Sequence, residues 1–126
     1  MVFAVTIIDE WVHFWNDFNL EKVEKLFLSD DRVTYFSSEF EGLIKGYDNL
    51  VSHHEGFGFV NGGKDTGSKL WLEDIEVEEF CETVLVKADW LFLRKDADTP
   101  QKGPVTMVYV KESDEYKIVH CHFSNY

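Results

Sequence analysis

The stretch that decides the fold is the run Tyr116-Lys117-Ile118-Val119-His120-Cys121-His122-Phe123-Ser124-Asn125-Tyr126. Its β-branched and aromatic residues predict a strand, in which alternate side chains share a face. Strict alternation places one set together: Ile118, His120, His122, Ser124 and Tyr126. The opposite face would carry the apolar set: Val119, Cys121 and Phe123. A final strand with one polar face either lines a cavity or faces water.

Size, charge and cysteine content limit the class of protein. A chain of 126 residues is long enough for a core, and we expect residues 1–126 to form a single domain. The net charge of -12, with only Arg32 and Arg94 as arginines, argues against nucleic acid and anionic membrane surfaces as partners. No apolar run approaches the ~20 residues that span a bilayer. Cys81 and Cys121 are too few for a disulfide framework, so we expect free thiols and a cytoplasmic location.

The first half of the chain predicts three helices around a short hairpin. Apolar residues at helical spacing mark the first helix: Ile8, Trp11, Val12, Trp15 and Phe18. A shorter helix over residues 20–27 follows, with Asn19 as its N-cap. Strands at 33–38 and 43–45 form the hairpin, and Gly46 then opens a third helix whose inward face continues to His54.

The second half predicts long strands at 70–78, 83–94 and 104–111, before the final one. The alternation slips near Glu73 and Asp74, which indicates a β-bulge. The order is α-α-β-β-α-β-β-β-β, which is typical of an α+β fold. We expect a cone-shaped, curved antiparallel sheet wrapped around the long N-terminal helix, with a cavity at its open end.

Several segments, in this order, resemble the SnoaL-like group of the nuclear-transport-factor-two-like or ketosteroid-isomerase-like superfamily. They are Trp15-Asn16, Leu26-Phe27, residues 31–36, Gly46-Tyr47-Asp48-Asn49-Leu50, Lys87-Ala88-Asp89-Trp90 and residues 116–124. The closing strand is also similar to the association domain of calmodulin-dependent kinases. The resemblance implies the cone fold and a homodimer formed through the outer sheet face. Because the superfamily includes isomerases, dehydratases, cyclases, hydrolases and assembly modules, the fold does not select a function.

The sequence departs from the steroid-isomerase pattern at each catalytic position. Steroid isomerases carry an aspartate base on the first strand, and this aspartate has no counterpart in Thr34-Tyr35-Phe36-Ser37. In steroid isomerases the first helix carries an oxyanion-stabilising tyrosine, whereas here Trp11 and Trp15 occupy that face. Steroid isomerases also carry an acid on a late strand, and this chain has none near Val108-Tyr109. These departures disfavour isomerase chemistry of that type.

Three histidines are the candidate catalytic residues. His120 and His122 share a strand face, and His54 faces inward from the third helix. A neutral imidazole is suited to proton transfer near neutral pH, but each histidine also has a structural interpretation as a satisfied core or interface residue. A metal site is a weaker alternative, with His54 or Glu39 completing a His-x-His pair, and we predict no metal or other cofactor.

Aromatic residues are the candidate ligand-binding groups, and they equally suit a core. They are Trp11, Trp15, Tyr35, Tyr47, Trp90 and Tyr109. Our first hypothesis is a homodimer that binds a small apolar or aromatic molecule in the cone, with cofactor-free acid/base chemistry. The alternative is a non-catalytic dimerisation or assembly module, which predicts a cavity blocked by side chains and a large apolar interface.

Overall fold

The computed structural model of the chain describes residues 2–126. The helical elements are α1 (Val2–Asp17), the 3-10 turn η1 (Leu20–Lys22), α2 (Val23–Leu26) and α3 (Tyr47–Phe57). The strands are β1 (Thr34–Phe36), β2 (Ile44–Lys45), β3 (Lys69–Phe80), β4 (Thr83–Leu93), β5 (Gln101–Glu112) and β6 (Glu115–Phe123). The predicted order of helices and strands is confirmed.

The six strands form one open sheet in the order β2-β1-β6-β5-β4-β3. Neighbouring strands are antiparallel except β1 and β6, which are parallel, with Tyr35 opposite Cys121. The expectation of a wholly antiparallel sheet is therefore wrong for this pair. Hairpins impose the antiparallel pairing of β3 through β6, whereas β1 and β6 are distant in sequence and no hairpin fixes their relative direction.

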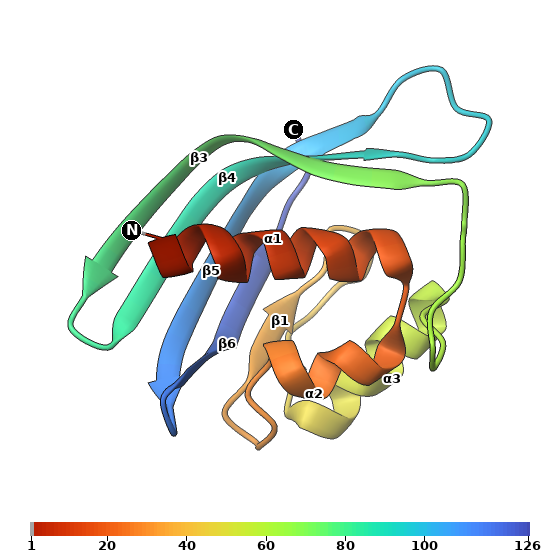
Figure 1. Ribbon diagram of the computed structural model, residues 1–126. Coiled ribbons are helices and arrows are strands. Elements are labelled where there is room, and N and C mark those ends of the chain that lie inside the picture. Colours follow the sequence, from red (N-terminus) through yellow and green to blue (C-terminus); the bar gives the residue numbers. More distant parts are fainter. Residues whose placement is uncertain (1) are drawn as a thin grey trace.

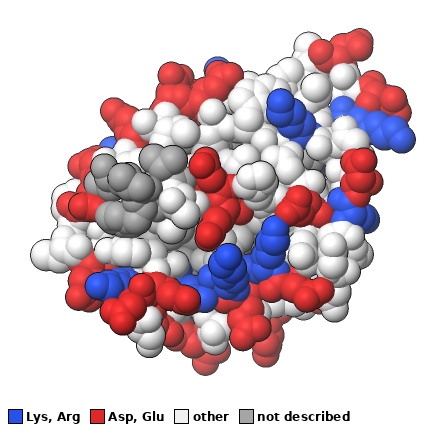
Figure 2. All heavy atoms as spheres, in the orientation of Figure 1, with Lys and Arg blue, Asp and Glu red and all other residues white. Residues whose placement is uncertain are grey.

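The sheet curves around α1, which crosses its concave face, while α2 and α3 lie at one end of the cone (Figure 1). None of the helices in residues 2–126 has the length and hydrophobicity needed to span a bilayer. Figure 2, in the orientation of Figure 1, shows acidic side chains spread over this side of the molecule, with basic side chains between them.

The inside of the cone is a dense aromatic core. From α1, Trp11 and Phe14 are fully buried, and Trp11 stacks on Phe123 of β6 with ring centroids 5.6 Å apart. Phe14 packs against Phe59 at 4.6 Å, beyond the end of α3. Burial of rings of this size is a main source of stability, about 25 cal/mol for each Å² of apolar surface removed from water.

A β-bulge in β6 changes which side chains face inward. The pairing with β5 shifts by one residue, because Val108 lies opposite His120 whereas Tyr109 lies opposite Ile118. Val119 is the extra residue, so Ile118 is buried together with Cys121. The prediction that Ile118 shares a face with His120 is thus wrong, because strict alternation does not continue through a bulge.

Two local predictions are confirmed. The pairing of β3 with β4 is irregular between Glu73 and Glu76, and Asp74 has a positive φ of 53°. At the start of η1, the Asn19 side chain accepts a hydrogen bond from the backbone N–H of Glu21 at 3.1 Å.

Candidate functional site

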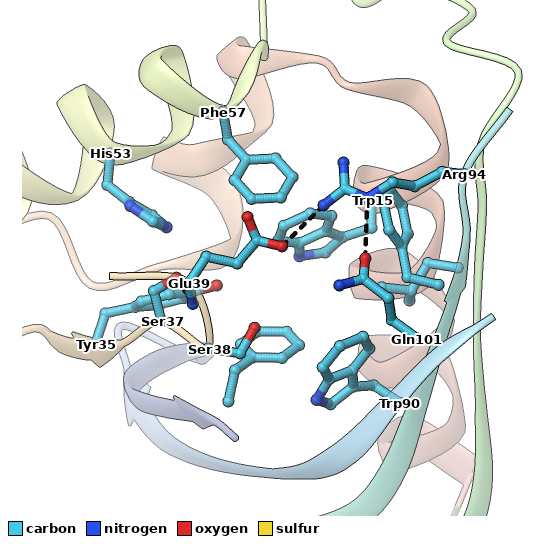
Figure 3. A pocket seen from close by; sticks show the side chains of 13 residues that line it. Trp15, Tyr35, Ser37, Ser38, Glu39, His53, Phe57, Trp90, Arg94 and Gln101 are labelled. Carbon is cyan, nitrogen blue, oxygen red and sulfur yellow. Dashed lines mark hydrogen bonds and ion pairs between the residues drawn. The ribbon is translucent and has the colours of Figure 1, made fainter. Parts of the chain in front are cut away.

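A pocket opens at the wide end of the cone, between the β1–β2 connection, α3 and the ends of β4 and β5 (Figure 3). Its walls are mostly aromatic, and these rings come from α1, β1, α3, β4 and β6. They are Trp15, Tyr35, Phe57, Trp90, Phe92 and Phe123. Amphipathic strands and helices supply such a wall because each directs its apolar face into the cone.

Polar side chains lie around the mouth of this pocket, on both sides of the opening (Figure 3). They are Ser37, Ser38, Glu39, His53, Arg94 and Gln101. Apolar walls with a few converging polar groups are typical of small-molecule sites. Of the residues that the structure describes around the pocket, Arg94 is the only lysine or arginine.

An ion pair spans the mouth of the pocket. The Arg94 guanidinium donates to Glu39 Oε1 at 2.8 Å and, through Nε, to Gln101 Oε1 at 2.9 Å (Figure 3). The guanidinium also lies over the rings of Phe92 and Phe57, at 5.2 and 5.9 Å from their centroids. Arg94 thus links the end of β4 and the start of β5 to the β1–β2 connection.

The space inside is small while this ion pair is formed. The pocket volume is about 30 Å³, enough for one or two water molecules. The large rings of α1 and β6 fill much of the cone, so the cavity expected at its open end is a small pocket among the described residues.

The last residues of the chain brace the pocket. Trp90 Nε1 donates to the Ser124 carbonyl at 2.9 Å, and Asn125 Nδ2 donates to the Ser38 carbonyl at 2.9 Å. Gly103 permits this arrangement, since a Cβ there would lie 1.8 Å from the Ser124 oxygen. The segment 124–126, which we call the terminal brace, holds one wall and the β1–β2 connection together.

His53 is the histidine that lines the pocket, and the sequence reasoning missed it. Its ring lies 5.1 Å from that of Tyr35, and partial burial lowers its pKa from the ordinary value. His53 is therefore neutral near pH 7 and able to accept a proton. The signal was its spacing from Leu50 and Phe57, which places it on the helix face beside the most buried stripe.

His54 faces inward as predicted, but into the core. It is fully buried among aromatic rings that include Phe14 and Phe59, at centroid distances of 5.3 and 5.1 Å. Its Nδ1 donates to the Leu50 carbonyl at 2.9 Å, which leaves Nε2 as an acceptor without a partner among the described residues. Burial lowers the pKa of His54 to about 3, so the ring is neutral.

His120 and His122 lie on the outer face of the sheet, away from the pocket. Their ring centroids are 6.2 Å apart. His120 Nδ1 lies 2.7 Å from Thr34 Oγ1, and His122 Nε2 lies 3.2 Å from Ser124 Oγ. Partial burial and the neighbouring His122 lower the pKa of His120.

The six aromatic candidates divide into two groups. Trp15, Tyr35 and Trp90 line the pocket, and burial raises the pKa of Tyr35 well above its ordinary value. The other three lie elsewhere: Trp11 and Tyr109 are buried in the core, and Tyr47 lies at the start of α3 beside a separate surface hollow. Tyr109 donates its hydroxyl hydrogen to Met107 Sδ at 3.9 Å.

Possible metal ligands are dispersed in the structure. Within residues 2–126, no group of three or more His, Cys, Asp or Glu side chains is placed to hold a metal ion. His54 is inside the cone and Glu39 pairs with Arg94 at the pocket mouth, so neither completes a site with the two histidines of β6.

Comparison with known proteins identifies the family. The family model described as the SnoaL-like domain matches residues 5–126, and the chain belongs to this family. None of the curated proteins compared with the chain gives a significant match.

Solved structures share the fold. An NTF2-like protein of unknown function from Pseudomonas putida KT2440 has a TM-score of 0.82 and 16% identity, covering 96% of this chain and 82% of that one. An NTF-2-like protein of unknown function from Shewanella oneidensis MR-1 has a TM-score of 0.78 and 17% identity, covering 97% and 96%. The association domain of Caenorhabditis elegans CaMKII has a TM-score of 0.77 and 16% identity, covering 97% and 92%. At these identities the likeness shows an NTF2-like α+β cone fold.

Proposed function

We propose that this protein binds a small, largely apolar or aromatic molecule in the pocket at the open end of the cone. One observation carries the proposal: a largely aromatic wall leads to a small set of polar groups around an opening to solvent. Binding sites for small molecules combine these features, because apolar walls supply affinity and a few polar groups fix orientation. The free thiols of Cys81 and Cys121 support the expected cytoplasmic location.

His53 is the group that we propose for proton transfer to or from a bound molecule. It is neutral, lies at the pocket and is close to Tyr35. Chemistry by His53 needs no cofactor, since an imidazole both accepts and donates protons near neutral pH. We do not assign this role to His54, which is enclosed in the core, or to His120 and His122, which lie on the outer face.

The indole N–H groups offer a direct test in ¹⁵N-labelled protein. Trp15 and Trp90 line the pocket, whereas Trp71 donates to Glu73 Oε2 at 3.1 Å on the exposed side of β3. Titration with cyclohexanol or cyclohexanecarboxamide should shift the Trp15 and Trp90 resonances in a saturable way and leave that of Trp71 unchanged. Absence of saturable shifts at Trp15 and Trp90 with any probe overturns the proposal.

A second candidate function is favoured by the pocket volume of about 30 Å³. A cone filled by its own side chains suits a non-catalytic assembly module. In either case we propose a homodimer formed through the outer face of the sheet, where Val108 and His120 lie opposite each other. A chain that dimerises and shows no saturable pocket binding would fit the assembly module.

A further inference from the structure

We propose that the pocket selects a small carboxylate with an apolar body, and that the ligand carboxylate replaces that of Glu39 on Arg94. This inference rests on the proposed binding function and names the chemical class of its ligand. Four observations carry it: the support of Arg94, the exposure of Glu39, the small closed volume and an unpaired donor in the pocket wall.

Arg94 is held in place independently of Glu39. Gln101 accepts from its Nε, and the rings of Phe92 and Phe57 lie beneath its guanidinium. Stacking on rings and a fixed donor fork pre-organise an arginine for a carboxylate. If Glu39 leaves, Arg94 therefore stays at the mouth with its NH2 donors directed toward the vacated position.

Glu39 is easy to displace. It lies in the connection between β1 and β2, and its side chain is 36% exposed. Arg94 is the only described partner of its carboxylate, and the Arg94 side chain is 46% exposed. An exposed ion pair of this kind contributes little to stability, because water screens the two charges. A ligand that offers an equivalent carboxylate loses little by exchanging with it.

The small volume means that a group must move before a ligand of ordinary size enters. About 30 Å³ is far below the roughly 300 Å³ at the lower end of small-molecule pockets. Movement of the buried aromatic wall would disrupt the core, whereas movement of the connection around Glu39 breaks one exposed ion pair. Entry through the Glu39 side places the ligand directly beside Arg94.

The wall contains a second donor that needs an acceptor. Trp15 is 6% exposed, and its Nε1 has no hydrogen-bond partner among the described residues. Figure 3 shows the Trp15 ring near the middle of the pocket, between Phe57 and Trp90. An indole N–H only donates, and an unpaired buried donor is costly. An oxygen-rich anionic group on the ligand satisfies both this donor and Arg94.

The charge balance of the mouth agrees with an anionic ligand. The pocket lining contains one cationic side chain and one carboxylate, those of Arg94 and Glu39. When Glu39 moves away, a single positive charge remains beside aromatic rings, and a neutral ligand leaves it unpaired. A carboxylate restores the pair in a less hydrated setting, where the interaction is stronger.

The experiment compares cyclohexanecarboxylate with cyclohexanecarboxamide, a neutral compound of nearly the same shape. Dissociation constants come from the Trp15 and Trp90 indole shifts in wild type, Glu39→Gln and Arg94→Gln. Two controls match the charge changes at exposed sites that do not line the pocket: Glu41→Gln in the same connection, and Arg32→Gln, which pairs with Asp30 and Glu112.

We expect wild type to bind the carboxylate at least about tenfold more tightly than the amide. Glu39→Gln removes the competing carboxylate and should tighten carboxylate binding about threefold or more, with amide binding unchanged. Arg94→Gln should abolish the preference for the carboxylate and retain amide binding. Neither control should alter the preference by more than about twofold.

The inference is overturned by equal affinity of wild type for both probes, or by an unchanged preference of Arg94→Gln for the carboxylate. In either case, saturable binding of cyclohexanecarboxamide would still support the proposed function. Failure of both probes to shift Trp15 and Trp90 overturns the proposed function and the inference together.

Discussion

The rings of His53 and His54 lie 5.3 Å apart at 81° to each other, yet only His53 lines the pocket. One residue along α3 separates a histidine at an opening to solvent from a histidine enclosed by aromatic rings. The two side chains are thus suited to different roles: His53 can contact a ligand, whereas His54 packs in the core.

The first prediction concerns the pH dependence of stability. The pKa of His54 is about 3 in the folded chain and 6.5 in the unfolded one, so the unfolded chain binds a proton first as pH falls. His54 therefore lowers the free energy of unfolding as pH drops from about 6.5 toward 3, by about 2–3 kcal/mol at pH 4.5. His54→Phe should flatten this decrease, measured by urea denaturation across that range.

His13 provides the matched control, because it is exposed on α1. His13→Asn should leave the slope of stability against pH as in wild type. An unchanged slope in both His54→Phe and His54→Leu would contradict the burial of a neutral His54.

The second prediction tests the aromatic core. Phe14 is fully buried and packs against Phe59 and His54. Phe14→Ala should lower the free energy of unfolding by about 3–5 kcal/mol, because it removes a large ring and leaves a cavity. Phe40 is 57% exposed, so Phe40→Ala should change the same quantity by less than about 1 kcal/mol. Similar decreases in the free energy of unfolding for Phe14→Ala and Phe40→Ala would contradict this packing.

The third prediction compares two glycines. A Cβ at Gly103 would meet the Ser124 oxygen at 1.8 Å and Trp90 Nε1 at 2.9 Å. Gly103→Ala should displace the terminal brace, destabilise the fold by about 1–3 kcal/mol and shift the Trp90 indole resonance.

At Gly56, inside α3, a Cβ meets nothing within 4 Å. Gly56→Ala should stabilise by about 0.4–1 kcal/mol. Destabilisation by Gly56→Ala, or an unmoved Trp90 resonance in Gly103→Ala, would count against this description.

The fourth prediction addresses the proposed dimer. Val108 is partly buried on the outer face of β5, opposite His120. Val108→Glu places a charge in the proposed interface and should convert the dimer to monomer in sedimentation equilibrium. Lys111→Glu, at the exposed end of β5, should leave the dimer intact. Wild-type protein that sediments as a monomer at all concentrations would contradict the proposal.

Much of the fold was predictable because it depends on local patterns. The helical stripe from Ile8 to Phe18 and the irregularity near Asp74 are visible in the sequence, and each corresponds to the observed element. The direction of β1 relative to β6 was not predictable, since no short loop connects them. The bulge at Val119 was also missed, because a single inserted residue leaves no mark in an otherwise regular strand.

The candidate site was less predictable than the fold. Trp15, Tyr35 and Trp90 were selected as possible wall residues, and they line the pocket. The pairing of Glu39 with Arg94 joins residues 55 positions apart and depends on how the β1–β2 connection folds over the end of β4. Periodicity contains no information about such a contact, and it separates His53 from His54 only by the angle around the helix.

The terminal brace gives the chain a built-in reporter. Ser124 and Asn125 contact Trp90 and the Ser38 carbonyl, on opposite sides of the pocket. Displacement of the β1–β2 connection removes the Asn125 attachment. The amide hydrogens of Ser124 and Tyr126, which donate to the Pro104 and Lys102 carbonyls, should then exchange with solvent faster whenever the mouth is open. Hydrogen exchange at these last residues would then measure how often an empty pocket opens, without any ligand in hand.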